Sequence, residues 1–163
     1  MNSSDFKSAL GSWASGVAVI STEEAGLCQG VTVSSFTSLS LDPPLILICL
    51  VPTARVVAPL RRTSRFAVSV LAADQEGVSR HFAARGRAPQ AGFGAIPVSR
   101  TPDGLPTVAG AAAWLECTAE ALLPQGDHLI VVGRVESAGA DDAKSPLLYF
   151  RRDYQALAGR GRP

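Results

Sequence analysis

The sequence lacks the features that would place it among nucleic-acid-binding, secreted or membrane proteins. Its 15 basic and 14 acidic residues leave a formal net charge of +1, so neither nucleic acid nor an anionic membrane is expected as its main partner. The three cysteines are an odd number without a C-x-x-C pair, which favours a reduced, cytoplasmic environment. The longest apolar run, residues 45–51, is too short to cross a bilayer. The N-terminal residues do not resemble a signal peptide.

The chain also lacks the usual signatures of hydrolytic and metal-dependent catalysis. It contains no nucleophile-elbow motif, no paired-carboxylate pattern and no cluster of residues with metal-ligand spacing. We therefore expect no metal site.

What the chain does have is length and apolar content. Its 163 residues suffice for one domain with a substantial core. We expect a single domain over residues 1–163, with its core at about 6–157 and a flexible tail at 158–163. Hydrophobic residues make up 47% of the chain and the mean hydropathy is +0.20. This composition indicates either apolar surface buried between subunits or an unusually rich core.

Strand patterns outnumber helix patterns along the chain. Helices are predicted at 4–15, 54–62 and 74–84, and strands at 17–22, 28–34, 45–51, 66–71, 113–123, 128–136 and 146–150. The nearly continuous apolar run at 45–51 is typical of a strand buried on both faces, whereas residues 85–104 are predicted to form a loop rich in glycine and proline. Because helices do not alternate regularly with strands, the pattern favours a mainly β fold, an antiparallel barrel with peripheral helices.

The most informative segment is residues 30–44. A strand rich in β-branched residues gives way to hydroxyl side chains, and the sequence Asp42-Pro43-Pro44 then turns the chain into the next strand. The hydroxyl side chains are those of Thr32, Ser34, Ser35, Thr37 and Ser38. Together with neighbouring apolar residues, they suit a large, flat ligand with a polar edge. The alternative is a hydroxyl-rich strand end beside a turn.

Further short motifs occur in a fixed order along the chain. Together with the segment above, they lie at residues 16–22, 30–36, 40–45, 49–50, 66–71, 79–83, 114–117, 126–128, 132–135 and 146–149. In this order and spacing they resemble the short-chain flavin reductase family, the reductase components of two-component flavin monooxygenases. The resemblance extends over about residues 6–157.

The resemblance implies a fold, a reaction and partners. The fold is a Greek-key split β-barrel, commonly a homodimer with the flavin near the subunit interface. NADH or NADPH is the hydride donor, FMN or FAD is the acceptor, and the reduced flavin leaves to serve a separate oxygenase. Hydride transfer from nicotinamide C4 to flavin N5 needs no protein nucleophile, which agrees with the missing catalytic motifs.

The resemblance also assigns site residues. Contacts with the flavin, or with the surroundings of its phosphate, fall to Thr32, Val33, Ser34, Ser35, Asp42, Cys49, Leu50, Ser79 and Phe82. His128 would lie near the nicotinamide, where it hydrogen-bonds the carboxamide or donates a proton near the reduced flavin. Tyr149 would close over the nicotinamide side. Structural roles remain open as alternatives: a corner for Asp42, a small core residue for Cys49, a structural histidine at a strand start for His128 and simple packing for Tyr149.

The chain departs from the family pattern at one point. After residues 49–50 the family usually has a Ser-x-Thr arrangement that helps to hold the flavin phosphate, but here the two positions are Ala54 and Val56. Thr53 and Arg55 lie beside them, and a guanidinium can offer phosphate a charge-assisted pair of hydrogen bonds. We therefore expect Thr53 and Arg55 to contribute to flavin binding.

Two other functions are compatible with these residues. One is a repurposed flavin-binding split barrel that acts as a tailoring enzyme or partner subunit, and the other is a flavin-binding protein without catalytic activity. NAD(P)H oxidation that depends on added flavin distinguishes the reductase from both.

Overall fold

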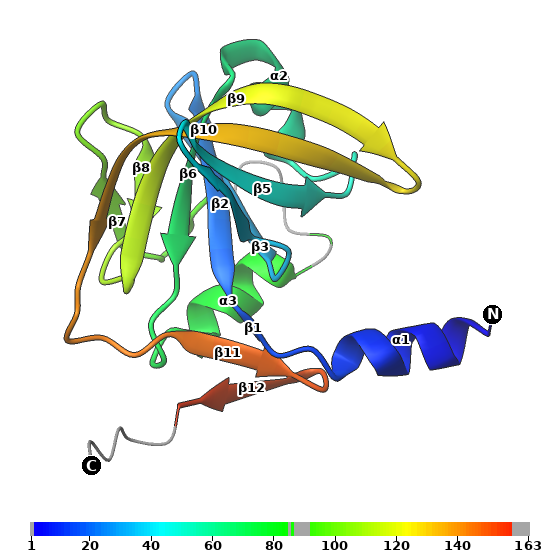
Figure 1. Ribbon diagram of the computed structural model, residues 1–163. Helices are drawn as coiled ribbons and strands as arrows, with labels where there is room; N and C mark the ends of the chain where they lie inside the picture. The colour runs from blue at the N-terminus through cyan, green and yellow to red at the C-terminus, as the bar shows by residue number, and fades with distance from the viewer. Residues whose placement is uncertain (1, 85, 87–91, 158–163) are drawn as a thin grey trace.

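One curled antiparallel sheet organises the fold. The computed structural model describes residues 2–84, 86 and 92–157. The seven strands of the main sheet are, in spatial order, β3 (Leu27–Val33), β2 (Ala18–Glu24), β6 (Arg65–Val70), β9 (Ala113–Gln125), β10 (His128–Ala140), β5 (Pro44–Leu50) and β4 (Thr37–Leu41). All neighbouring pairs are antiparallel. The sheet bends round on itself without closing (Figure 1), so the predicted mainly β, split-barrel-like architecture is confirmed.

A side chain links β3, at one edge of this sheet, to β5, the strand next to the other edge. The Ser35 hydroxyl, just after β3, accepts a hydrogen bond from the backbone N–H of Cys49 on β5 at 3.0 Å. It also donates to the Cys49 carbonyl at 2.9 Å. These bonds hold the end of β3 against β5, although the two strands are far apart in the order of the sheet.

Two apolar clusters fill the interior. The first lies inside the curled sheet and includes Ile20, Ile48 and Phe66. The second includes Val19 and Phe82 and lies where helix α3 (Glu76–Ala83) packs on the sheet. Because successive side chains of a strand point to opposite faces, Val19 and Ile20 belong to different clusters. β2 is therefore buried on both faces.

β5 is buried on only one face, so the prediction for the run at 45–51 was wrong. Ile46 and Ile48 are buried, whereas Leu45 and Leu47 are half-buried on the other face. The continuous apolar run has two causes. One set of side chains enters the core, and the other forms part of an apolar surface.

The helices lie outside the main sheet, and no helix in the described part is long and apolar enough to cross a bilayer. α1 (Ser3–Gly11) ends earlier than predicted, because the chain must become extended to pair Ser15 with Tyr149. α1 projects away from the sheet (Figure 1). α2 (Val57–Thr63) begins three residues later than predicted and packs through Val57 and Leu60.

Five short strands were not predicted. Besides β4, they are β1 (Ser15–Gly16), β7 (Val98–Arg100), β8 (Pro106–Val108) and β12 (Asp153–Ala156). β1 and β12 flank β11 (Leu147–Phe150), and β7 pairs with β8. β7 lies inside the segment predicted to be loop. Residues 85 and 87–91 of that segment, and the predicted tail at 158–163, lie outside the described residues.

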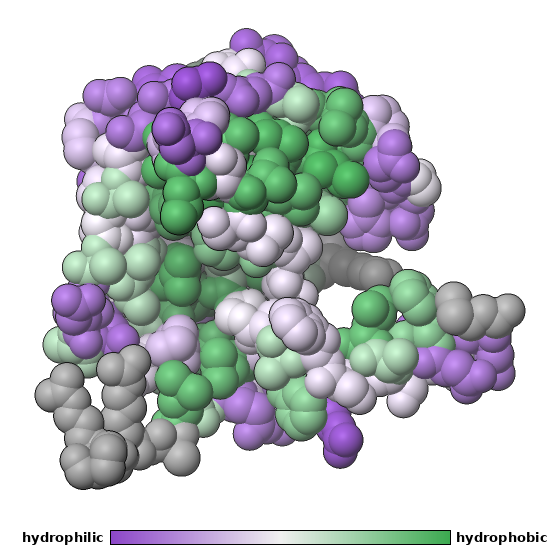
Figure 2. Space-filling model, in the orientation of Figure 1, coloured by the Kyte–Doolittle hydropathy of each residue, from purple (hydrophilic) through white to green (hydrophobic). Residues whose placement is uncertain are grey.

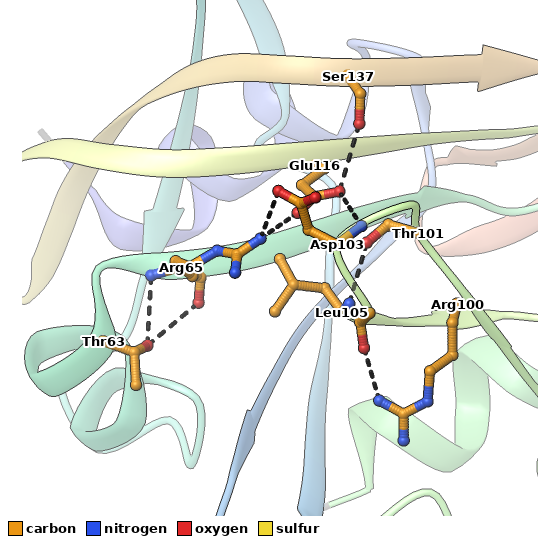
Figure 3. Close-up of polar contacts among 9 residues, drawn as sticks. Thr63, Arg65, Arg100, Thr101, Asp103, Leu105, Glu116 and Ser137 are labelled. Atoms are coloured by element: carbon orange, nitrogen blue, oxygen red, sulfur yellow. Dashed lines mark hydrogen bonds and ion pairs between the residues drawn. The ribbon is translucent and has the colours of Figure 1, made fainter.

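A buried carboxylate ties the β7–β8 loop to the main sheet. Glu116 on β9 is 1% exposed, forms an ion pair with Arg65, and accepts hydrogen bonds from the Asp103 N–H at 3.4 Å and the Ser137 hydroxyl at 3.3 Å (Figure 3). Burial alone would raise the pKa of Glu116, but hydrogen bonds from Thr101, Asp103 and Arg65 bring it below the usual value. Glu116 is therefore charged at neutral pH and holds the loop through that charge.

Candidate functional site

Three adjoining clefts surround β3. The first, here called the central cleft, has a volume of about 240 Å³ and lies between the end of β3, the end of β5 and the start of β10. Its lining residues are Val31, Thr32, Val33, Ser34, Ser35, Cys49, Leu50, Val51 and His128. The structure thus brings most of the residues assigned to the flavin ring, together with His128, into one cleft.

The hydroxyl groups of the central cleft differ in whether they are already hydrogen-bonded within the protein. Besides the Ser35 bonds to Cys49, the Thr32 hydroxyl donates to the Ser79 carbonyl at 2.7 Å. Ser34 is exposed, and its hydroxyl makes no hydrogen bond within the described part of the chain. Among these three hydroxyls, only that of Ser34 keeps its proton for a ligand.

His128 is the first residue of β10 and reaches the central cleft beside Leu50. Its Nδ1 lies 2.7 Å from Oδ1 of Asp127, and this hydrogen bond lowers the pKa of Asp127. An ionised carboxylate can only accept, so Nδ1 carries the donated hydrogen. Nε2 is then left for a ligand, as an acceptor in neutral His128 and as a donor in the protonated form.

The second cleft, here called the arginine cleft, has a volume of about 520 Å³. Its lining residues are Gly30, Val31, Val51, Thr53, Ala54, Arg55, Phe82, Ala83, Ala84 and Gly86. Thr53, Arg55 and Phe82, which were all assigned to flavin binding, meet here. Of the two positions that lack the family's hydroxyls, only Ala54 faces this cleft, because Val56 is fully buried in the core.

Gly30 allows β3 and α3 to pack closely beside the arginine cleft. A Cβ at this position would lie 2.5 Å from the Phe82 ring. Phe82 is 2% exposed and packs edge-on against Phe93, with ring centroids 4.8 Å apart. Its position is therefore fixed by the core, and only part of its ring lines the cleft.

The third cleft, here called the tyrosine cleft, has a volume of about 150 Å³ and is lined by Val17, Thr32, Val33, Ser34, Ser79, Ala83, Tyr149 and Tyr154. The hydroxyls of Ser79 and Tyr154 are 2.8 Å apart. The rings of Tyr149 and Tyr154 meet edge-on, with centroids 5.2 Å apart. The Arg80 guanidinium lies 4.9 Å from the Tyr154 centroid. Ser79 is thus beside Tyr149 rather than in the arginine cleft with Phe82.

The sequence interpretation missed Tyr154. The residue lies on β12, which follows a two-residue turn formed by Arg151 and Arg152. Both turn residues have positive φ, 50° and 66°, where glycine or asparagine is usual. Because the turn contains neither glycine nor asparagine, the hairpin could not be recognised from the sequence.

Asp42 lies apart from the other predicted site residues. It is exposed, precedes Pro43 with a cis peptide bond between β4 and β5, and lines none of the three clefts. The structure therefore supports a structural role for Asp42 in the turn between β4 and β5.

The three clefts adjoin one another, and together they are called here the groove along β3. Thr32, Val33 and Ser34 line both the central and the tyrosine cleft, and Val31 and Val51 line both the central and the arginine cleft. The groove offers apolar walls for a planar ring and, at one end, a cation for a phosphate, which is the donor set a flavin nucleotide requires. The described residues include no group of three potential metal ligands.

Comparison with known proteins gives a consistent picture. The family model for the flavin reductase like domain matches residues 10–158. An NADH-dependent flavin reductase of a Rhodococcus species is 39% identical over 160 residues, which cover 96% of this chain and 87% of the relative. The reductase component of 4-hydroxyphenylacetate 3-monooxygenase of Thermus thermophilus is 41% identical over 152 residues, covering 93% and 95%.

A solved structure agrees with these relatives. It is an NADH:FAD oxidoreductase of Streptomyces globisporus C-1027 in complex with NAD and FAD fragments. The two structures align with a TM-score of 0.89 and 34% sequence identity, covering 98% of this chain and 94% of the other.

Proposed function

This chain belongs to the flavin reductase like domain family, and on that premise we propose that it reduces free flavin with NADH and supplies the reduced flavin to a separate monooxygenase. The observation that carries the proposal is the groove along β3, whose adjoining clefts contain an apolar slot, a histidine and an arginine. Relatives named as an NADH-dependent flavin reductase and as a monooxygenase reductase component support the donor and the destination of the electrons. No observation favours either of the alternative functions.

The bound nicotinamide and flavin supply the hydride chemistry, and the protein positions the two rings. Val33 and Leu50 would hold the flavin ring in the central cleft, while the Ser34 hydroxyl would donate to the polar edge of the ring. Thr53 and Arg55 would bind the phosphate in the arginine cleft. Because this set keeps one neutral hydroxyl and replaces the other by a cation, phosphate binding should depend more strongly on ionic strength than binding by two hydroxyls.

His128 would act on the nicotinamide side of the flavin. Its Nε2 can accept a hydrogen bond from a carboxamide N–H when the ring is neutral, and can donate a proton when it is charged. Asp127 holds the ring in place through Nδ1. Tyr149 and Tyr154 would exclude water from the adjoining end of the groove.

We further propose that the protein is a homodimer. Leu39, Leu41 and Leu123 on β4 and β9 are 50%, 90% and 49% exposed. Figure 2 shows hydrophobic residues gathered over the region of β9, β10 and β5. Cys49 of β5 lines the central cleft, so this face is continuous with the groove. A second copy that covers the face would remove apolar surface from water and complete the edge of the flavin site.

The cytoplasm is the proposed location. Cys28, Cys49 and Cys117 are all free thiols, as expected in a reducing compartment.

The experiment that tests the function is NADH and NADPH oxidation by the purified protein, titrated with FMN and with FAD. Saturable turnover that requires added flavin and prefers NADH is the expected result. Absence of turnover with every flavin and donor combination would refute the reductase. If flavin still bound in that case, the repurposed split barrel would become the better hypothesis.

A further inference from the structure

A separate cleft of about 700 Å³ lies between α1 and the β11–β12 turn, outside the groove along β3. We call it the basic cleft. Its lining residues are Ser3, Ser4, Lys7, Ser8, Gly11, Ser12, Arg151 and Arg152. The lining therefore combines three cations with four hydroxyls and contains no carboxylate.

Within the described part of the chain, the cations of the basic cleft form no ion pair with a carboxylate. Elsewhere in the described part of the chain, ion pairs with carboxylates are formed by Arg62, Arg65, Arg80, Arg100, Arg134 and Lys144. Among the described residues, Lys7 and Arg152 have no such partner. The guanidinium of Arg151 lies over the Phe150 ring, 5.1 Å from its centroid. Three cations around one cleft, with no ion-paired carboxylate among the described residues, create a local positive potential that attracts anions.

The backbone presents two of these cations at a conformational cost. Arg151 and Arg152 both have positive φ, in the left-handed region that non-glycine residues avoid. The Arg151 N–H donates to the Gly11 carbonyl at 2.9 Å. This bond fixes the turn beside the C-terminal end of α1, and Figure 1 shows these two segments next to each other. Strained positions of this kind concentrate where side chains serve a function.

We propose that the basic cleft binds the phosphate groups of a nucleotide or of a free polyphosphate. Guanidinium groups match pairs of phosphate oxygens, the Lys7 ammonium adds a point charge, and serine hydroxyls donate further hydrogen bonds. The volume leaves room for a nucleoside beside a diphosphate. The site shares no lining residue with the groove along β3, so the proposal stands independently of the reductase activity.

The test is calorimetric titration of the full chain with pyrophosphate, ADP and adenosine at low salt. Two variants remove one charge each, Lys7→Gln and Arg152→Gly. Glycine suits the φ of 66° at position 152, so Arg152→Gly should not lower the melting temperature. A loss of binding in this variant therefore cannot be attributed to misfolding. Arg61→Gln is the matched control, because Arg61 is an exposed arginine on α2 outside the basic cleft.

The expected result is saturable binding of pyrophosphate that each charge-removing variant weakens about tenfold and Arg61→Gln leaves unchanged. Tighter binding of ADP than of pyrophosphate, weakened by Lys7→Gln and by Arg152→Gly, would identify a nucleotide as the ligand of the basic cleft. Equal affinities that the two variants weaken alike would identify the phosphate groups alone. Flavin-dependent NADH oxidation should be the same in all variants, which separates this site from the reductase site. The proposal is overturned if pyrophosphate gives no saturable heat, or if Arg152→Gly and Arg61→Gln bind it equally well.

Discussion

At the scale of single residues, His128 is the side chain whose removal should separate rate from affinity. In His128→Ala the flavin ring keeps its apolar walls, so the flavin dissociation constant should change less than about twofold, while kcat/KM for NADH falls about tenfold through loss of one hydrogen bond. Steady-state NADH oxidation and flavin fluorescence titration measure the two quantities. His128→Gln should recover part of the rate, because an amide also donates and accepts. An unchanged kcat/KM in His128→Ala would show that the residue is structural.

Glu116 shows how a buried charge contributes to stability at a distance from the groove. Glu116→Gln should lower the free energy of unfolding by about 2 kcal/mol, because Arg65 loses its buried partner but remains partly hydrated. The folded-state pKa of Glu116 lies below the usual 4.5, so its stabilisation is complete above the unfolded-state pKa and is lost as the pH falls through the lower folded-state pKa. Urea unfolding should therefore show a difference in stability between the wild type and Glu116→Gln that is smaller at about pH 3 than at pH 7. A difference independent of pH would contradict the role of the charge.

At the scale of elements, the contact between β3 and α3 sets the shape of the arginine cleft. In Gly30→Ala the new methyl group meets the buried Phe82 ring, so the variant should lose about 2 kcal/mol of stability and bind flavin more weakly as α3 moves. Thermal unfolding and flavin titration test this. Gly77→Ala on α3 is the control, since nothing lies within 4 Å of its Cβ and alanine favours helix. Equal effects of the two substitutions would exclude the steric explanation.

How much the sequence could predict also differs from element to element. Long strands such as β9 and β10 were found because their pattern is extended and bounded by a glycine turn. The residues of the central cleft were assigned through the resemblance to the flavin reductase family. β12 and Tyr154 were missed because Arg151 and Arg152 adopt backbone angles that no local propensity favours. The sequence also could not predict that the Thr32 and Ser35 hydroxyls form hydrogen bonds within the protein, because their partners, Ser79 and Cys49, are distant in sequence.

At the scale of the whole molecule, the exposed leucines are the basis of the proposed dimer interface. Across β4, β5, β10 and β9 the apolar side chains continue onto the outer face of the sheet. Phe6 and Leu10 on α1, and Trp13 just after it, are also exposed. A surface of this kind is expected to be covered in solution. Because this apolar surface lies close to the central cleft, flavin binding should be linked to dimer formation. A flavin that binds the dimer more tightly than the monomer stabilises the dimer.

Leu41→Glu tests this linkage directly. Leu41 is 90% exposed, so a charge there should change the stability of an isolated subunit little. In a two-fold symmetric dimer both subunits bring the charge into the interface, and the dimer dissociation constant should rise about a hundredfold. Sedimentation velocity should show the variant as a monomer under conditions in which the wild type is a dimer, and its flavin affinity should fall. Val98→Glu on β7, outside the main sheet and 41% exposed, should change neither property. A Leu41→Glu protein that stayed dimeric would place the interface elsewhere, whereas a monomer with full flavin affinity would show that one subunit builds the whole site.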